Sequence, residues 1–453
     1  MMLNMVCAAM CYGQGRDGLV ITQTVDAVEL SGMDGDVLQA SSNMTTWSDL
    51  GGFSGTYTNG ADAETEYFRL RPPNYTFFNY EDYPEIMLMD HDKNLVHTWT
   101  NDFAPAASVY MFPDGSIMSA TRAGHTRLEK RDWESNLLWS YDNLSRTNRQ
   151  HHDIEPLPNG NVLIIAREPL PAADVIASGR DPDRIVKATQ FMSETIVEIM
   201  PTGTDGGKVV WRWDVMDHII QDFDETKPNF GVISEHPELV NINYATERGI
   251  DWLHANAVTY NAELDQIMIS MRGFNEIWII DHSTTIAEAA SHSGGARGRG
   301  GDLLYRWGNP QAYNLGTEKD QVLGGQHDPS WIPAGYPGEG HILMFNNGTH
   351  RLYSSVDEII PPLQEDGSYF REPGKAYGPT NLTWTYQASV PTNFYSFNFS
   401  GTQRLPDGNT LISDGHGGRI FEVTPDGTTV WSHDLPDGKE IFWARRVYFE
   451  LPE

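Results

Sequence analysis

Cysteine is almost missing from this chain. Cys7 and Cys11 are the only two among 453 residues, and both lie within the first eleven. No disulfide can therefore hold the body of the fold together, and no thiol can take part in its chemistry. Residues 1–15, MMLNMVCAAMCYGQG, are apolar and end in small residues, as the last part of a secretory signal peptide does. We therefore expect residues 1–15 to be a signal-peptide remnant and the protein to be secreted or periplasmic.

Positive charge is scarce as well. Lysine and arginine number 31 against 62 aspartates and glutamates, so the formal net charge is −31. Such a surface repels nucleic acids and anionic membranes, which argues against both as partners. No apolar run approaches the length that spans a bilayer. Neither a P-loop nor a G-x-G-x-x-G motif before a helix indicates a nucleotide site.

Clean helical periodicity is the third absence. The nearest candidate for a helix, residues 217–233, is short and is interrupted by Pro228. The chain instead contains 42 glycines, 26 prolines, 13 tryptophans and 19 tyrosines, which favours many short strands joined by tight turns. Residues 16–74 alternate polar and apolar residues between glycine and asparagine turns, and we expect them to form a small β-sandwich-like module.

A repeat begins after this module. Its first half is a strand, a turn rich in Pro, Asn, Asp and Gly, and a second strand. The clearest copies are MFPDGSIMSATR at residues 111–122, PLPNGNVLIIAR at residues 156–167 and RLPDGNTLISDG at residues 404–415. Two degenerate copies cover residues 259–272 and 333–347.

The second half of each repeat is an apolar strand, a turn and a strand that ends in an aromatic residue, as in RIFEVTPDGTTVWSHD. Four such strands are typical of a propeller blade, and five blades can be identified. A half-blade at residues 84–99 and a pair of strands at residues 439–451 would form a sixth and close the ring. We therefore predict an all-β fold with a six-bladed β-propeller over residues 75–453. A seven-bladed ring is the alternative.

Histidines recur at one point of the repeat. His152 lies six residues before the turn proline Pro158, and the matching strand starts of the next two repeats hold His254 and His327. The innermost strand of every blade lines the central channel of a propeller, so these side chains are predicted to converge on the axis. His151 precedes His152 and could take its place in the cluster.

Arginines recur on the paired strand. Counting from the turn asparagine or its equivalent gives Arg122, Arg167 and Arg272, and Asn347 has this position in the next blade. Histidines and arginines together would suit an anion with several oxygens, because the guanidinium group offers a planar fork of donors. The alternative is that each residue only ties loops together. A residue with that role should recur in every blade, whereas the histidines occupy three adjacent blades.

Two other functions fit parts of this pattern. Three neutral histidines with an open position could hold zinc and make the protein a metal-assisted hydrolase. Arg272 close by would repel a dication, and neither an H-x-x-x-H pair nor a C-x-x-C motif supports this reading. We therefore predict no metal and no other cofactor. A non-catalytic propeller that binds an anion or a protein partner at the channel mouth is the second alternative.

The stretch DWLHANAVTY, an arginine eighteen residues after its histidine, and the later GGQHDPSW resemble the bacterial arylsulfate sulfotransferases. These are secreted or periplasmic six-bladed propellers with a small N-terminal β domain, and the resemblance covers about residues 75–450. It implies a ping-pong transfer of sulfate from an aryl sulfate to a phenol through a sulfohistidine. The reaction would be independent of the nucleotide donor PAPS and of any cofactor. A homo-oligomer is compatible with this prediction.

The resemblance also implies roles for the candidate site residues. His327 would be the nucleophile that accepts the sulfuryl group. His152, or His151 in its place, would act as an acid or base or as a further contact to the anion. His254, Asn256 and Arg272 would hold the sulfuryl oxygens and stabilise the developing charge. From the arginine repeat we further expect Arg167 and Arg122 to contact the substrate.

Overall fold

The computed structural model describes residues 20–23, 27–31, 37–41, 48–52, 56–60, 67–71, 74–121, 127–142, 149–185, 190–244, 251–449 and 451–452. Before residue 74 the description covers the backbone only. The expected signal-peptide remnant at residues 1–15 and the predicted contact residue Arg122 lie outside the described residues.

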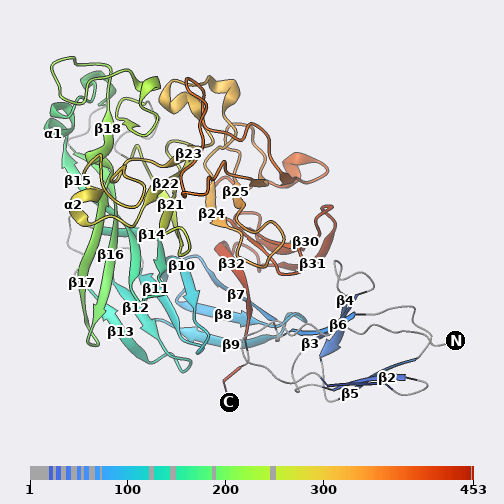
Figure 1. Ribbon diagram of the computed structural model, residues 1–453. Helices are drawn as coiled ribbons and strands as arrows, with labels where there is room; N and C mark the ends of the chain where they lie inside the picture. Colours follow the sequence, from blue (N-terminus) through green and yellow to red (C-terminus); the bar gives the residue numbers. More distant parts are fainter. Residues whose placement is uncertain are drawn as a thin grey trace.

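Six four-stranded antiparallel sheets form the blades of a propeller (Figure 1). Blade 1 contains β32 (Ile441–Tyr448), β7 (Asn74–Tyr80), β8 (Glu85–Met89) and β9 (Leu95–Thr100). Blade 2 contains β10 (Pro105–Met111), β11 (Ile117–Thr121), β12 (Leu128–Arg131) and β13 (Leu137–Tyr141). Blade 3 contains β14 (Arg149–Pro156), β15 (Val162–Pro171), β16 (Gln190–Thr202) and β17 (Gly206–Asp214).

The second half of the ring follows the same order. Blade 4 contains β20 (Ala255–Asn261), β21 (Gln266–Met271), β22 (Glu276–Asp281) and β23 (Tyr305–Trp307). Blade 5 contains β24 (His327–Trp331), β25 (Ile342–Asn346), β26 (Ser355–Ile359) and β27 (Trp384–Tyr386). Blade 6 contains β28 (Gly401–Arg404), β29 (Thr410–Asp414), β30 (Arg419–Val423) and β31 (Thr429–Asp434). The first strands of successive blades contact one another in a closed ring around the axis.

The predicted six-bladed ring is confirmed, and both ends of the chain share its closing blade. Figure 1 shows the red strand β32 beside the blue strand β7, with which it pairs. The division differs from the expected two pairs of strands, because three strands come from the N-terminal side and one from the C-terminal side. The sequence of β32, IFWARRVY, contains no turn residue and therefore runs as one continuous strand. Six sheets account for the propeller in the described part of the chain, so the seven-bladed alternative is wrong.

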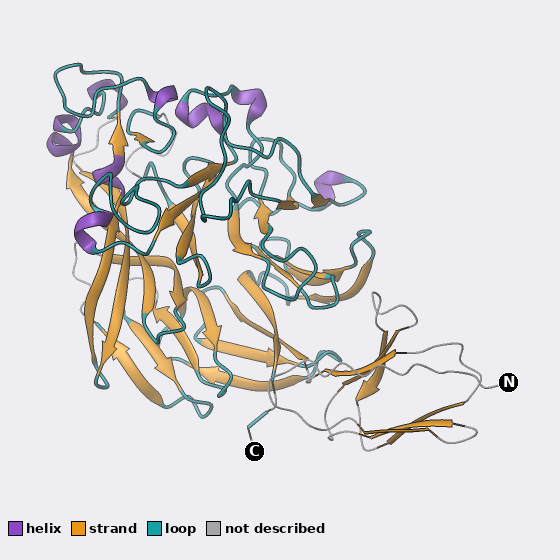
Figure 2. Cartoon of the chain, in the orientation of Figure 1, coloured by secondary structure: helices purple, strands orange, loops and turns teal. Residues whose placement is uncertain are grey.

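Helices are few and short in the described residues, and Figure 2 shows them in purple outside the sheets. The α-helices are α1 (Ala172–Ala177) and α2 (Ile286–Ala289). The helix considered at residues 217–233 does not form, and this segment contains the end of a 3₁₀-helix and the two-residue strand β18. Pro228 and Gly231 oppose a longer helix there. The 3₁₀-helices are η1 (Pro182–Arg184), η2 (Val215–His218), η3 (Ile233–Glu235), η4 (Pro310–Tyr313), η5 (Glu318–Asp320) and η6 (Pro391–Asn393), and β18 (Ile219–Ile220) pairs with β19 (Val240–Asn241).

The N-terminal strands form two three-stranded antiparallel sheets, consistent with the expected sandwich-like module. One sheet has the order β1-β2-β5 and the other β4-β3-β6. The boundary between module and propeller near residue 74 remains a prediction. The strands are β1 (Val20–Gln23), β2 (Ala27–Ser31), β3 (Val37–Ser41), β4 (Ser48–Gly52), β5 (Thr56–Gly60) and β6 (Tyr67–Arg71).

Apolar side chains fill the space between neighbouring blades. The middle strands β21 and β22 of blade 4 are buried along their whole length. One buried cluster joins Met268 and Ile279 of blade 4 to Ile342 and Met344 of blade 5. Full burial of each such side chain contributes roughly 1.5–3 kcal/mol. Packing between blades therefore stabilises the scaffold that carries the axis.

One ring of the fourth strand in each blade donates a hydrogen bond to the next blade. Each acceptor is an oxygen of a loop or strand end, so the ring N–H or O–H is satisfied where it is buried. The ring residue near the end of each repeat therefore links neighbouring blades by a hydrogen bond. The six bonds run from His97 Nε2 to Trp133 O (2.8 Å), Trp139 Nε1 to Gly206 O (2.8 Å), Trp211 Nε1 to Thr284 Oγ1 (3.0 Å), Tyr305 Oη to Gly378 O (2.7 Å), Trp384 Nε1 to Pro425 O (2.7 Å) and Trp431 Nε1 to His91 O (2.8 Å).

In three blades, a glutamate on the third strand provides a second kind of contact with the next blade. Each binds a polar residue at the hairpin turn of its own blade and a cation of the next blade. The contacts are Glu198 with Asn161 and His282, Glu358 with His341 and Arg404, and Glu422 with Asn409 and Arg446. We call these ring and carboxylate contacts the seams.

Candidate active site

His152 and His254 lie in contact at the axis. Their ring centroids are 4.8 Å apart, and the ring planes are inclined by 70°. His152 lies in the bulge of β14, where the register shifts between Gln150 and Ile154, and His254 immediately precedes β20. Their φ angles are +55° and +51°. This left-handed backbone costs about 1–3 kcal/mol per residue, so the surrounding contacts must hold both residues in place.

A neighbouring hairpin holds the backbone of His254. The Arg272 N–H donates to the carbonyl of His254 at 3.1 Å, and the Gly273 N–H donates to the carbonyl of Leu253 at 2.7 Å. A Cβ at Gly273 would collide with the carbonyl oxygens of Trp252 and Leu253. Glycine at position 273 therefore permits the close approach that places His254.

His327 is the first residue of β24 and is buried. Its Nδ1 lies 2.8 Å from Asn347 Oδ1. The Asn347 amide nitrogen donates to the carbonyls of Ser396 at 2.8 Å and Phe399 at 3.0 Å, which fixes the orientation of the amide. Since Oδ1 can only accept, Nδ1 of His327 carries the proton in the neutral ring and Nε2 has the lone pair. Asn347 thus prepares the Nε2 atom as a nucleophile.

Phe442 of β32 connects His327 to the other two histidines. Its ring centroid lies 5.9 Å from that of His327 and 6.4 Å from that of His152. The three predicted histidines are therefore brought together. Their shared place in the repeat does not give one strand register, because His152 lies in a bulge, His254 precedes its strand and His327 pairs with Phe345.

His151 lies behind His152 and bonds to it. The two Nδ1 atoms are 2.7 Å apart, and His151 Nε2 lies 2.7 Å from Glu194 Oε2. Burial lowers the pKa of both histidines well below the usual value, and nearby positive groups lower it further. Burial also raises the pKa of Glu194 to about 8. Both imidazoles are therefore neutral at pH 7.

Arg167 and Asp251 surround the other side of His254. Arg167 Nη2 lies 2.9 Å from Asp251 Oδ1 and 3.1 Å from His254 Nδ1, and Arg167 Nε lies 3.3 Å from Glu194. Asp251 Oδ2 lies 2.5 Å from His254 Nδ1. Burial alone would raise the pKa of Asp251, but His254 and Arg167 outweigh it and lower the pKa to about 2. Asp251 is therefore ionised and holds the Nδ1 proton of His254.

Arg272 and Asn256 both contain a buried polar atom that lacks a hydrogen-bond partner among the described residues, Nε of Arg272 and Oδ1 of Asn256. Arg272 Nη2 makes a long contact of 3.5 Å to Phe397 O. The amide of Asn256 donates at 2.8 Å to the carbonyl of Gln326, next to His327. An unsatisfied guanidinium N–H suits a bound anion. Asn256 holds the backbone before His327 and has a second N–H for another acceptor.

Asp153 and Asp328 follow two of the histidines and anchor their strands. Asp153 accepts the N–H of Val258 at 3.0 Å, and Asp328 accepts the N–H of Thr402 at 2.7 Å. Arg445 also donates to Asp328 at 2.9 Å. Each aspartate thus bonds to the inner strand of the following blade and limits movement of the histidine beside it.

A cavity of about 530 Å³ opens next to the cluster. Two predicted histidines, His151 and His152, line it together with Arg167. Apolar side chains cover part of its wall, so it offers both a polar end and a surface for a flat ring. The lining also includes Ala106, Ala107, Pro169, Met192, Phe399 and Phe442.

Four residues of the cluster are not predicted as site residues from the sequence. Asn347 had a signal, because it occupies the position of the arginines in the neighbouring blades. Asp251, Glu194 and Phe442 had none, because they come from a loop, a third strand and the last strand of the chain. Contacts between blades are not visible in the local pattern.

Fold and site together define a six-bladed propeller with buried histidines, arginine and a cavity beside its axis. The chain belongs to the arylsulfotransferase (ASST) family, whose model matches residues 74–431. This membership supports a sulfotransferase-like enzyme that acts on aryl sulfates and phenols. No curated protein matches the chain.

Three solved structures are similar to this chain at low sequence identity. A protein of unknown function from Bacteroides caccae is 11% identical and has a TM-score of 0.45, with 83% of this chain and 99% of that chain covered. AztD from Citrobacter koseri is 7% identical with a TM-score of 0.39, covering 84% and 100%. Virginiamycin B lyase from Staphylococcus aureus is 9% identical with a TM-score of 0.37, covering 79% and 84%. Among the described residues, no helix is long and apolar enough to cross a membrane.

Proposed function

We propose that this protein moves a sulfuryl group from an aryl sulfate to a phenol through a covalent intermediate on His327 Nε2. The observation that carries the proposal is the hydrogen bond from His327 Nδ1 to Asn347 Oδ1, which places the lone pair of the neutral ring on Nε2, the atom proposed as the nucleophile. No nucleotide donor and no cofactor takes part in this reaction.

The first half-reaction transfers the sulfuryl group to the enzyme. Nε2 of His327 attacks the sulfur, an N–S bond forms, and the bond between sulfur and the aryl oxygen breaks with its electron pair going to the leaving phenolate. In the second half-reaction the acceptor phenol loses its proton, its oxygen attacks the sulfur, and the N–S bond breaks. His327 then regains its original state.

Neutral His152 is suited to accept the phenol proton. Burial and the charges around it lower its pKa, so the ring is unprotonated at neutral pH and can act as a general base. His151 lies against it at 2.7 Å and can relay the proton toward Glu194. This division gives His152 the contact with substrate and His151 a supporting role.

The sulfuryl oxygens would lie near Arg272 and His254. Arg272 offers a buried N–H that has no other hydrogen-bond partner in the described part of the chain. Preorganised donors of this kind stabilise the negative charge that develops during transfer. Arg167 is already paired with Asp251 and Glu194, so its role would be to fix His254 more than to bind the anion.

The aryl ring would occupy the apolar part of the cavity. Phe399, Phe442 and Met192 line it, and its volume of about 530 Å³ admits a small aromatic molecule. We further propose that the protein works outside the cytoplasm, as the signal-like residues 1–15 indicate.

The test is to incubate the protein with a chromogenic aryl sulfate without an acceptor and to map any adduct by mass spectrometry. One sulfuryl group on His327 is expected, and a phenol should remove it. His327→Ala should give neither adduct nor turnover, whereas His341→Ala, a histidine of the same blade at a seam, should give both. Turnover that is unchanged in His327→Ala would reject the covalent route. Binding without turnover in the wild type would instead indicate a non-catalytic propeller.

A further inference from the structure

A second histidine cluster lies away from the axis, where blade 3 meets the loops of blade 4. His218 ends η2, His292 follows α2, and Asp302 precedes β23. Asp302 Oδ1 lies 2.8 Å from His218 Nδ1 and 2.7 Å from His292 Nδ1. One ligand atom from each residue lies within 4.8 Å of the others. Two imidazole nitrogens and one carboxylate oxygen thus converge on one point.

The orientation of His218 is fixed independently of this convergence. Its Nε2 lies 2.8 Å from the carbonyl oxygen of Ala289, so Nε2 must donate its proton there. The ring is fully buried and stacks on Trp213 with an interplanar angle of 4°. The backbone of Gly301 passes so close that a Cβ there would collide with Nε2. In the neutral ring the lone pair on Nδ1 therefore points at Asp302.

A lone pair that faces a carboxylate oxygen is unfavourable unless something positive lies between them. A second proton on the buried imidazole would supply it, and a divalent cation would do so for both histidines at once. We propose that His218, His292 and Asp302 bind Zn²⁺, with a fourth position open to water. Two histidines and one carboxylate are typical ligands of this ion, whereas calcium and magnesium prefer oxygen alone.

The geometry can adapt to the ion with little movement. Bonds of about 2.0–2.2 Å to a tetrahedral ion place the ligand atoms about 3.3–3.6 Å apart, farther than the 2.7 and 2.8 Å seen here. The His292 side chain is 61% exposed, and it belongs to the segment SHSGGARGRGGD, which is rich in glycine. This side chain can move outward and also leaves a path for the metal to enter.

The proposed ion would link His292 and Asp302 of this glycine-rich loop to His218 after the last strand of blade 3. Trp213 already donates to the carbonyl of Gly301 at 2.7 Å, next to Asp302. The site uses none of the three axial histidines, so it stabilises the fold without taking part in sulfuryl transfer. The zinc proposal is therefore independent of the proposed function.

The experiment titrates the chelator-treated full chain with Zn²⁺ by calorimetry and repeats the titration with Co²⁺ in the visible range. One equivalent per chain should bind and raise the melting temperature, and cobalt should give the absorption of a four-coordinate site. His292→Ala should weaken zinc binding by more than about 100-fold. Loss of a residue that only hydrogen-bonds to a metal ligand costs up to about that much, and loss of a ligand itself should cost more. The mostly exposed side chain of His292 makes this variant safe for folding.

The matched control is His236→Ala. This exposed histidine pairs with Glu238 at 3.0 Å but has no third ligand in the described metal-type groups. Its loss should leave zinc binding and the thermal shift unchanged. Absence of stoichiometric binding by the wild type would overturn the proposal, and so would equal affinity in His292→Ala. His218→Gln and Asp302→Asn give a further check through the cobalt spectrum.

Discussion

At the seams, a ring of the fourth strand donates to the next blade in all six blades. At the axis, histidines converge from blades 3, 4 and 5 only. Both regions contain buried histidines and carboxylates, and at the seams a carboxylate bonds to groups of two blades, as Glu198 does with Asn161 and His282. Buried atoms without a hydrogen-bond partner among the described residues occur in both, at Arg272 Nε and Asn256 Oδ1 on the axis and at Arg404 Nε at a seam. The axis differs in its left-handed histidines His152 and His254 and in the cavity beside them.

This difference separates what the fold requires from what a ligand requires. A contact that recurs in each blade follows from the need to join neighbouring sheets. Positive φ angles at His152 and His254 are costly for stability, and His152 lines a cavity, so these features indicate a site that serves a ligand. The comparison predicts that axial substitutions remove activity, whereas seam substitutions change stability.

The largest effect is expected for His327→Ala. Loss of the nucleophile should lower kcat/KM for aryl sulfates by at least about 10⁴-fold, equivalent to about 5.5 kcal/mol in the barrier. Steady-state rates with a chromogenic donor and a phenol give this number, and circular dichroism checks the fold.

The seam histidine of the same blade supplies the reverse case. His341→Ala breaks the bond to Glu358 and should lower the melting temperature while kcat/KM stays within a few-fold of wild type. Equal losses of activity in both variants would remove the distinction.

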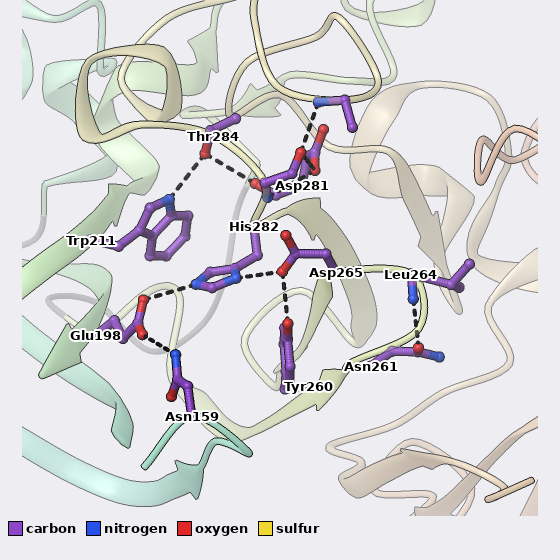
Figure 3. A network of polar contacts seen from close by, with 12 residues as sticks. Asn159, Glu198, Trp211, Tyr260, Asn261, Leu264, Asp265, Asp281, His282 and Thr284 are labelled. Carbon is purple, nitrogen blue, oxygen red and sulfur yellow. Dashed lines mark hydrogen bonds and ion pairs between the residues drawn. The ribbon is translucent and has the colours of Figure 1, made fainter. Parts of the chain in front are cut away.

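The second effect concerns the pH dependence of stability at the seam around His282. Figure 3 shows its ring between Glu198 and Asp265, at 3.1 and 2.7 Å. Burial alone would lower the pKa of His282, but the two carboxylates outweigh it and raise the pKa from 6.5 to about 9. The stabilisation is therefore complete below pH 6.5 and is lost as the pH rises through about 9. It amounts to about 3 kcal/mol.

Urea unfolding of wild type and His282→Gln between pH 6 and about 10 measures this contribution. The difference in unfolding free energy between the two proteins should shrink as the pH rises, because His282 loses its proton and its charge. Buried acids such as Glu194 titrate in both proteins, so their contributions cancel in this difference. Turnover at pH 7 should be the same in the two proteins. A difference that does not change with pH would show that the carboxylates do not charge His282.

The sequence predicts the blades better than the axial cluster, and the reason is physical. The blades were predictable because a strand, a turn and a strand form a local pattern that recurs. The sequence also predicts that His152, His254 and His327 converge, from their shared place in the repeat, but they do not share one strand register. Bulges and left-handed residues place them, and neither feature has a clear pattern in the sequence. The partners Glu194 and Phe442 come from distant strands, so only the closed ring brings them to the axis.

The third effect is a test of Asn347 as a positioning residue. Asn347→Asp keeps an acceptor at His327 Nδ1 but adds negative charge, which favours the protonated ring. A higher pH is then needed to free Nε2, so the acid limb of kcat should move upward by about 1 pH unit, equivalent to about 1.4 kcal/mol. Asn347→Leu should lower kcat without this shift. A purely structural role for Asn347 predicts reduced stability in both variants with an unchanged pH profile.

The smallest effect is expected at the seam that closes the ring. Trp431 Nε1 of blade 6 donates at 2.8 Å to the carbonyl of His91 in blade 1. Trp431→Phe keeps an aromatic ring but removes the donor, so the unfolding free energy should fall by about 1 kcal/mol. Because Trp431 lies far along the chain from every axial histidine and on an outer strand, kcat/KM at pH 7 should not change. A loss of activity without a loss of stability in this variant would mean that ring closure itself positions the axial cluster through β32 and Phe442, and the two regions would then be coupled.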